Sequence, residues 1–299
     1  MKPSPAPRPT LDRKNLALRM GTAAVFAVFF LTLLRLGDHP WSQRIFGLML
    51  AGGLVMGARE FTLMGRKLGC RPSLPAATLA GWAILLHFFL LGLDPTDPFP
   101  LWLALTVGAA CIHFGALLFE DLSRALASQA LTWMAAIYLG LGLGFQIKLF
   151  MFTDSTLPNT GGRMILALYL IVWMGDTAAY FAGSLLGRHK LAPKVSPKKT
   201  WEGAAGNLAG NLAAAFLIKA TVCPHWSGLD AGVIGLLLGT VGQLGDLVES
   251  TWKRSADVKD SNMGGVGIPG HGGMLDRIDS LVFAAPALYA YVHFVHGLN

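Results

Sequence analysis

The sequence predicts an all-α, polytopic integral membrane protein with about nine transmembrane helices and a cytoplasmic N-terminus. The first observation is composition: 53% of the 299 residues are AVILMFWYC and only 14% are charged, against about 25% charged in soluble domains. The second is a series of apolar runs, and the third is an uneven placement of Lys and Arg between them. Together they exclude a soluble enzyme, a disordered chain and a disulfide-stapled secreted domain.

Apolar runs long enough to cross about 30 Å of hydrocarbon occur along the whole chain. They occupy residues 16–36, 45–64, 74–93, 99–119, 125–147, 164–187, 203–223, 229–249 and 277–297. The run at 125–147 carries no charge, whereas Arg59, Lys219, Asp246 or Asp279 intrudes near one end of four others. The first run lacks a small-residue cleavage site and is therefore expected to be an anchor rather than a signal peptide.

The positions of the basic residues predict the orientation. A cytoplasmic N-terminus leaves only five of the 24 Lys and Arg residues on the opposite side, namely Arg35, Arg44, Lys148, Arg163 and Lys219. This bias agrees with the positive-inside rule. The net charge of +7 is thus explained by topology, and no nucleic-acid partner is expected because the chain lacks a basic soluble surface.

Three regions follow from this layout. Residues 1–15 are expected to form a disordered cytoplasmic tail, residues 16–160 the N-terminal membrane helices, and residues 161–299 a catalytic membrane domain with two cytoplasmic loops. The loops run from 187 to 203 and from 245 to 280, and both are polar and rich in Gly, Pro and charge. Topology and attraction to anionic lipids explain basic residues alone. They do not explain the interleaved acids, namely Asp176, Asp246, Glu249, Asp260, Asp276 and Asp279.

The second loop is flanked by acidic helix ends. If the run at 229–249 continues as a helix, its end presents one acid, one hydroxyl and two cations on one face. These are Asp246, Ser250, Lys253 and Arg254. Asp276 and Asp279 are neighbours at the start of the last helix, where capping is the simpler interpretation. Because the two helices are joined on the cytoplasmic side, Asp246 and Asp276 can face each other, as carboxylate ligands of Mg²⁺ would.

The connection between these helices is rich in glycine, which lets backbone amides approach a phosphate. Neither a GxxxxGK[ST] loop nor a GxGxxG motif after a strand occurs, so a soluble nucleotide-binding fold is not indicated. The interpretation from the residues is a cationic and metal-binding cluster for phosphates at the membrane face.

Both loops carry residues that match a known signature. The matches are Ser250, Lys253-Arg254, Lys259-Asp260, His271-Gly272-Gly273 and Asp276-Arg277-Ile278-Asp279, with Asp176-Thr177, Tyr180 and the segment 196–203 before them. Over roughly 176–280 the chain resembles the phosphatidate cytidylyltransferase family, also called CDP-diacylglycerol synthases. Two departures are a few extra residues between Asp260 and Pro269 and Ala178 at a position where Gly is common.

The resemblance implies that a phosphatidate oxygen attacks the α-phosphate of CTP, giving CDP-diacylglycerol and pyrophosphate at a bacterial inner membrane. It implies Mg²⁺ as cofactor, with a second cation left open, and CTP, phosphatidate and membrane lipids as partners, with a homodimer left open. Asp246, Lys253, Asp276 and His271 are the expected catalytic residues, and Asp246, Asp276, Asp279 and Asp260 the expected metal ligands. The expected substrate-binding residues are Ser196, Lys198, Lys199, Thr200, Ser250, Arg254, Lys259 and Arg277.

The expected role of His271 is a hydrogen bond or cationic contact to a phosphate. A phosphate monoester has a second pKa of about 6, so the nucleophile is already ionised and needs no strong base.

Two other classes of function are open. A secondary transporter also places charges near membrane ends, but here the charges cluster at one face and no inverted repeat is evident. A structural lipid-binding anchor would require the basic residues and not the acidic ones. A further class of lipid enzyme, the CDP-alcohol phosphotransferases, requires an Asp-Gly-x-x-Ala-Arg motif that the chain lacks.

Overall fold

The fold is that of a computed structural model, which describes residues 13–93, 96, 98–117, 124–153, 157–262 and 272–296. Within these segments the chain forms nine helices and one two-stranded sheet. The elements are α1 (Arg13–Arg35), α2 (Pro40–Lys67), α3 (Leu74–Leu93), α4 (Leu101–Ala116), α5 (Ala125–Phe150), α6 (Thr160–Leu186), β1 (Lys190–Ala192), β2 (Ser196–Thr200), α7 (Trp201–Thr221), α8 (Gly228–Ser255) and α9 (Leu275–His296).

Each apolar run predicted from the sequence lies largely within one of these helices. Six of them, α2, α3, α5, α6, α8 and α9, are long and apolar enough to cross a membrane. Between 39% and 56% of each apolar window is buried inside the protein, so the remaining side chains give the bundle an outward apolar surface. The chain is therefore a helical integral membrane protein, and membrane crossing by α1, α4 and α7 stays a prediction.

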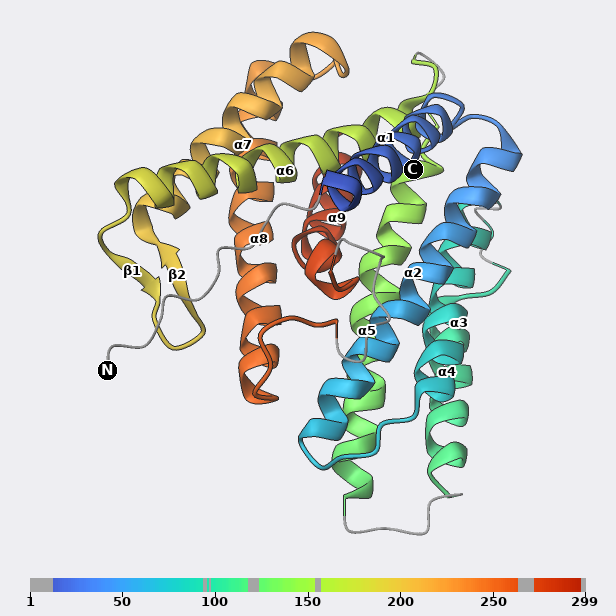
Figure 1. The fold of residues 1–299 in the computed structure, drawn as a ribbon. Coiled ribbons are helices and arrows are strands. Elements are labelled where there is room, and N and C mark those ends of the chain that lie inside the picture. The colour runs from blue at the N-terminus through green and yellow to red at the C-terminus, as the bar shows by residue number, and fades with distance from the viewer. Residues whose placement is uncertain are drawn as a thin grey trace, which may run out of the picture.

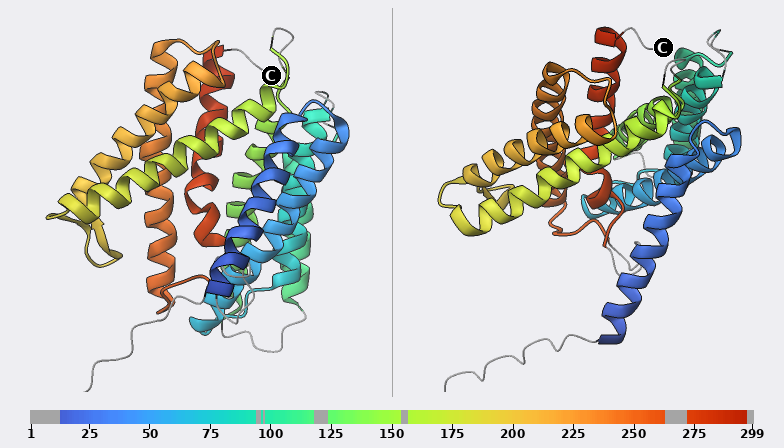
Figure 2. Two further views of the ribbon diagram at one scale, coloured as in Figure 1. Left: turned by 45° about the horizontal axis from the view of Figure 1, so that its top comes forward. Right: turned by 90° about the horizontal axis from the view of Figure 1, so that it is seen from above.

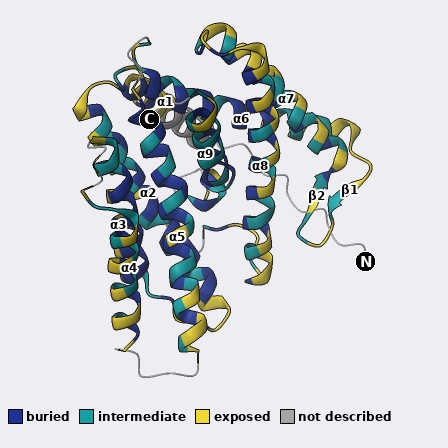
Figure 3. Cartoon of the chain, turned by 180° about the vertical axis from the view of Figure 1, so that it is seen from behind, coloured by how far each residue is buried: buried dark blue, intermediate teal, exposed yellow. Residues whose placement is uncertain are grey.

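The helices form two neighbouring groups (Figure 1). Helices α2 to α5 stand side by side in one group, and α7, α8 and the β-hairpin lie in the other, with α9 packed against both α5 and α8. Helix α6 packs along α7 and runs obliquely to α2 to α5 (Figure 2). Buried residues line the inner sides of α2, α5 and α9, whereas the hairpin carries mainly intermediate and exposed residues (Figure 3). Leu54, Leu139 and Leu275 of this core have no exposed surface.

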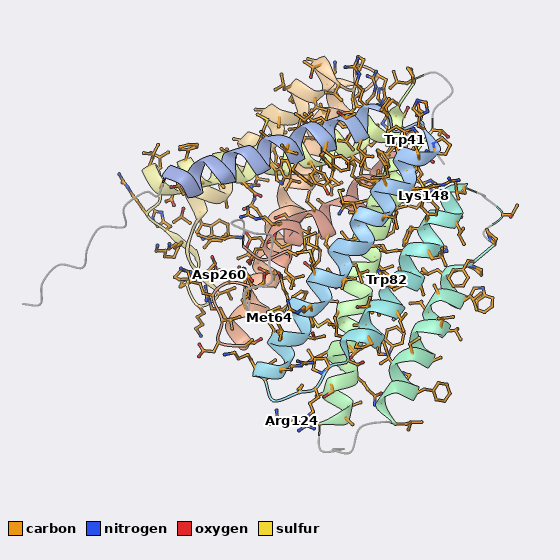
Figure 4. The ribbon with its side chains drawn as sticks, turned by 45° about the vertical axis from the view of Figure 1, so that its right-hand side comes forward. Trp41, Met64, Trp82, Arg124, Lys148 and Asp260 are labelled. Atoms are coloured by element: carbon orange, nitrogen blue, oxygen red, sulfur yellow. The ribbon has the colours of Figure 1, made fainter. Side chains whose placement is uncertain are left out.

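Two basic residues that were predicted on opposite sides of the membrane lie toward opposite ends of the bundle. In Figure 4, Trp41 and Lys148 lie near one end of α2, and Met64 and Arg124 lie toward the other. Lys148 and Arg124 were predicted on opposite sides of the membrane, and this arrangement agrees with that prediction.

The hairpin is a feature that the all-α prediction missed. Strands β1 and β2 pair antiparallel, with Lys190 opposite Thr200 and Ala192 opposite Ser196. Thr200 then caps α7, because its Oγ1 accepts a hydrogen bond of 3.1 Å from the Gly203 backbone N–H. The first polar loop is thus a short sheet joined directly to a helix.

Candidate active site

A cleft that contains several charged side chains opens among α6, α8, α9 and the hairpin. A cavity of about 610 Å³ is lined by Lys198, Lys199 and Thr200 of β2 and by residues of α6 to α9. A second cavity of about 350 Å³ lies between α6 and α9. The two share four lining residues and so form one recess, called the acidic cleft here for its carboxylates. The shared residues are Asp176, Asp276, Asp279 and Ser280, and Asp246 lines the larger cavity as well.

Lys253, in the last turn of α8, joins two carboxylates. Its Nζ lies 2.6 Å from Oδ1 of Asp276 on α9, and it forms an ion pair with Glu249 one turn earlier on α8. The Glu249 side chain has no exposed surface, and that of Lys253 is 12% exposed. This cluster holds the end of α8 against the start of α9. It confirms the prediction that α8 continues as a helix through Lys253 and meets the start of α9.

Asp246 connects α8 to the hairpin. Its Oδ2 lies 2.6 Å from Nζ of Lys199, and its Oδ1 accepts a hydrogen bond of 3.2 Å from the Ser250 hydroxyl. Asp246 and Asp276 both line the larger cavity, and their binding of Mg²⁺ stays a prediction. Each is paired with a lysine, Asp246 with Lys199 of the hairpin and Asp276 with Lys253 of α8.

Glu202 fixes the hairpin above α7. Its carboxylate accepts hydrogen bonds from the backbone N–H groups of Arg188 and His189, at 3.1 and 3.3 Å. It also lies 2.6 Å from Nδ1 of His189. The hydrogen bond from the His189 side chain is the main reason that the pKa of Glu202 is lowered to about 2. The hairpin that carries Lys198 and Lys199 on β2 is therefore anchored at its base.

A network of side-chain amides supports the floor of the cleft, and the sequence analysis missed it. Asn207 of α7 donates a hydrogen bond of 3.2 Å from Nδ2 to Oδ1 of Asp176. Its own oxygen accepts hydrogen bonds from Gln243 at 3.0 Å and Asn211 at 2.8 Å. Amide side chains in otherwise apolar helices were the available signal, since such groups must find partners in a membrane.

The remaining predicted residues differ in position. Arg277 lines the smaller cavity. Arg254 donates to the backbone oxygens of Val195 and Val258, and it lines neither cavity. Five other predicted residues also line neither cavity, namely Ser196, Ser250, Lys253, Lys259 and Asp260, of which Lys259 and Asp260 are exposed. His271 lies outside the described residues.

The carboxylates of the cleft suit a hard cation. Among the described residues no three acidic, His or Cys side chains are grouped closely enough to hold a metal ion by themselves. Mg²⁺ is commonly held by only one or two carboxylates, with waters and substrate phosphates completing its coordination. Asp246 and Asp276, which face one cavity, fit that kind of site.

Comparison with known proteins identifies the family. The family model described as the cytidylyltransferase family matches residues 17–295. The chain belongs to this family. Curated relatives of this cytidylyltransferase-family chain include proteins named phosphatidate cytidylyltransferase from Brucella suis biovar 1 (strain 1330), Bacillus subtilis (strain 168) and Staphylococcus epidermidis (strain ATCC 12228 / FDA PCI 1200).

The relatives are similar over part of their length. The Brucella protein is 47% identical over 44% of this chain and 47% of its own length. The Bacillus protein is 41% identical over 52% of this chain and 55% of its own length. The Staphylococcus protein is 39% identical over 60% of this chain and 66% of its own length. The matches thus span about half to two thirds of the relatives.

Proposed function

We propose that this protein transfers the cytidylyl group of CTP to phosphatidate, giving CDP-diacylglycerol and pyrophosphate. The observation that carries the proposal is the acidic cleft, in which Asp246 and Asp276 lie beside Lys199 and Lys253. Carboxylates with interleaved lysines suit a reaction between two polyanions, where charge must be screened before the phosphates can approach. The names of the curated relatives support the same substrates.

The reaction needs positioning more than proton transfer. A nonbridging oxygen of the phosphatidate phosphate attacks the α-phosphorus of CTP, and the bond from that phosphorus to the oxygen bridging to the β-phosphate breaks. The phosphate monoester loses its second proton at a pKa of about 6, so the attacking oxygen is ionised at neutral pH. Since no base is required, His271 would contact a substrate phosphate rather than accept a proton.

The residues in and beside the cleft would have different roles in binding the metal and the substrates. Asp246 and Asp276 would hold Mg²⁺, which supplies charge neutralisation at the phosphate oxygens when bound. Lys199 and Lys198 bind the phosphates of CTP from the hairpin side of the larger cavity. Lys253 holds the Asp276 carboxylate in one orientation through its 2.6 Å contact. Expected contacts from Ser196, Arg254 and Lys259 require the loop ends to move toward the cleft.

The smaller cavity suits the lipid substrate. It is lined by the apolar side chains of Val172, Trp173 and Leu281 together with Arg277 and the acids. Trp173 is 46% exposed on α6, a helix long and apolar enough to span the membrane. A lipid phosphate entering between α6 and α9 would meet the cation of Arg277 while its acyl chains stay against apolar surface.

The proposed topology has nine spans, a cytoplasmic N-terminus and a cleft open to the cytoplasm at a bacterial inner membrane. The distribution of Lys and Arg supports this orientation. Arg124 and Lys148 lie toward opposite ends of the bundle, as a membrane crossing by α5 requires.

Product analysis tests the function against the transporter alternative. The purified protein, incubated in detergent micelles with Mg²⁺, CTP and phosphatidate, should release pyrophosphate only when both substrates are present. A transporter would bind an anion without releasing pyrophosphate. Pyrophosphate release from CTP in the absence of phosphatidate would also contradict the proposed transfer.

A further inference from the structure

A buried glutamate of the N-terminal helices contacts the start of the helix that carries Asp276. Glu60 of α2 is 1% exposed. Its Oε1 accepts a hydrogen bond of 2.8 Å from the Met274 backbone N–H, and its Oε2 accepts one of 2.9 Å from that of Leu275. The first N–H groups of a helix have no partner within the helix, and an anion there also complements the helix dipole. Glu60 therefore caps α9 from another part of the chain.

The backbone is shaped for this contact. Gly57 lies almost one turn before Glu60 on α2, and a Cβ there would come within 3.3 Å of the Leu275 side chain. At Gly273 a Cβ would lie 1.8 Å from Oγ of Ser261 and 3.0 Å from the Asn262 backbone nitrogen. Any larger residue at Gly273 would displace Ser261. The close fit of α2, residues 261–262 and the start of α9 therefore depends on glycine.

Ser261 extends the contact from Glu60 to Asp276. Its hydroxyl oxygen lies 2.8 Å from Oε2 of Glu60 and 3.0 Å from Oδ2 of Asp276, and its backbone N–H donates to the same Oδ2 at 3.2 Å. A hydroxyl has one hydrogen to donate, so the two carboxylates compete for it. Asp276 is thus held by Ser261 on one oxygen and by Lys253 on the other.

We propose that Glu60 is a positioning residue of the active site. It fixes the start of α9 and, through Ser261, the direction in which the Asp276 carboxylate faces the acidic cleft. The assignment concerns the reaction proposed above and rests on it. Glu60 lies 201 positions before Ser261, so the N-terminal helices would contribute directly to the geometry of the C-terminal site. The competing explanation is that Glu60 only stabilises the fold.

Glu60→Gln separates these explanations when it is compared with a matched variant. The amide keeps the shape but has one acceptor oxygen, and its NH₂ group would face a backbone N–H donor. Asp230→Asn is the control, because Asp230 is a buried carboxylate that closes a capping box at the other end of α8. It lies about 30 Å along the helix from Ser250, at 1.5 Å per residue.

The expected result is a difference in kcat at similar stability. Glu60→Gln should lower kcat by about 100-fold, the scale reported for small misplacements of reacting groups, and change the KM for CTP little. Asp230→Asn should keep the kcat of the unmodified protein even if its melting temperature falls as much as that of Glu60→Gln. Equal losses of kcat in the two variants would assign Glu60 a structural role only and overturn the proposal.

Ser261→Ala tests the link itself and stays informative if Glu60→Gln does not fold. It leaves the cap of Glu60 on α9 in place and removes the hydroxyl between the two carboxylates. We expect kcat to fall while the melting temperature changes little. An unchanged kcat would overturn the role of Ser261 in transmitting the effect of Glu60.

Hydrogen exchange tests the contact without any turnover. Glu60→Gln should speed exchange of the amides at 272–280 and leave those at 227–231 unchanged, with the opposite pattern in Asp230→Asn. Unchanged exchange at 272–280 would overturn the positioning role. Failure of the unmodified protein to use CTP would instead overturn the proposed function, so the two failures are distinguishable.

Discussion

Nζ of Lys253 lies 2.6 Å from Oδ1 of Asp276 while it also pairs with Glu249, whose side chain is fully buried. The ammonium group of Lys253 therefore pairs with the Asp276 carboxylate in the cleft and with the Glu249 carboxylate, which has no access to solvent. Breaking a buried ion pair costs far more than breaking an exposed one, because the remaining charge has lost its partner and its solvent. We therefore expect Lys253 to stabilise the fold as well as to arrange the site.

The first prediction concerns this dual role. Lys253→Met should lower the free energy of unfolding by about 3 to 5 kcal/mol, the usual cost of an uncompensated buried charge. Unfolding in detergent measures this change. The double variant Lys253→Met with Glu249→Gln should recover most of the stability without recovering turnover. A single variant as stable as the unmodified protein would show that the pair is not needed for folding.

The second prediction concerns the acidic residues of the cleft. Asp246→Asn and Asp276→Asn remove a charge at nearly constant shape and should each reduce kcat/KM by at least about 100-fold. Each should also raise the Mg²⁺ concentration needed for half-maximal activity. Asp257→Asn is the control, since Asp257 is exposed and lies outside both cavities. Near-normal activity and Mg²⁺ dependence in either cleft variant would place the metal elsewhere.

The third prediction separates substrate binding from attraction to the membrane. Lys199 is only 26% exposed and contacts Asp246, whereas Lys194 is exposed at the hairpin turn. Lys199→Met should lower kcat/KM by a factor that persists at high salt. Lys194→Met should lose only about 1 kcal/mol of attraction to anionic lipid, which salt screens. A small effect at Lys199 that salt abolishes would contradict its role in binding phosphate.

The fourth prediction concerns the pH dependence of the hairpin. The folded protein lowers the pKa of Glu202 from 4.5 to about 2, mainly through His189. The stabilisation is therefore complete above about pH 4.5 and is lost as the pH falls toward 2. Pepsin should cleave residues 186–191 more slowly in the unmodified protein than in Glu202→Gln at about pH 4, and equally at about pH 2. Equal cleavage at both values would rule out this anchor.

The sequence predicted those features that depend on local pattern. Apolar runs located the helices, and helical spacing placed Asp246 and Lys253 on one face of α8. The connection between the last two helices predicted that the end of α8 lies near the start of α9. The hairpin was missed because its short strands contain three lysines and a proline, which do not favour strands. It is fixed instead by hydrogen bonds from its base to Glu202.

Contacts between distant segments could not be read from the sequence. Glu60 lies beside Arg59, and the pair resembles an ordinary charged helix end; only the folded chain shows that Glu60 caps α9. Asn207 carries a weaker signal of the same kind, because an amide within an apolar helix must find a partner. Its contact with Asp176 depends on how α6 packs against α7, which periodicity does not determine.

Transfer of label from nucleotide to lipid tests the central claim most directly. The purified protein would be incubated with CTP labelled at the α-phosphate, phosphatidate and Mg²⁺, with the Asp276→Asn variant in parallel. The proposal predicts that label enters the lipid phase as CDP-diacylglycerol, with one pyrophosphate released per lipid formed, and that the variant transfers little. Label remaining wholly in the aqueous phase with the unmodified, folded protein would contradict it.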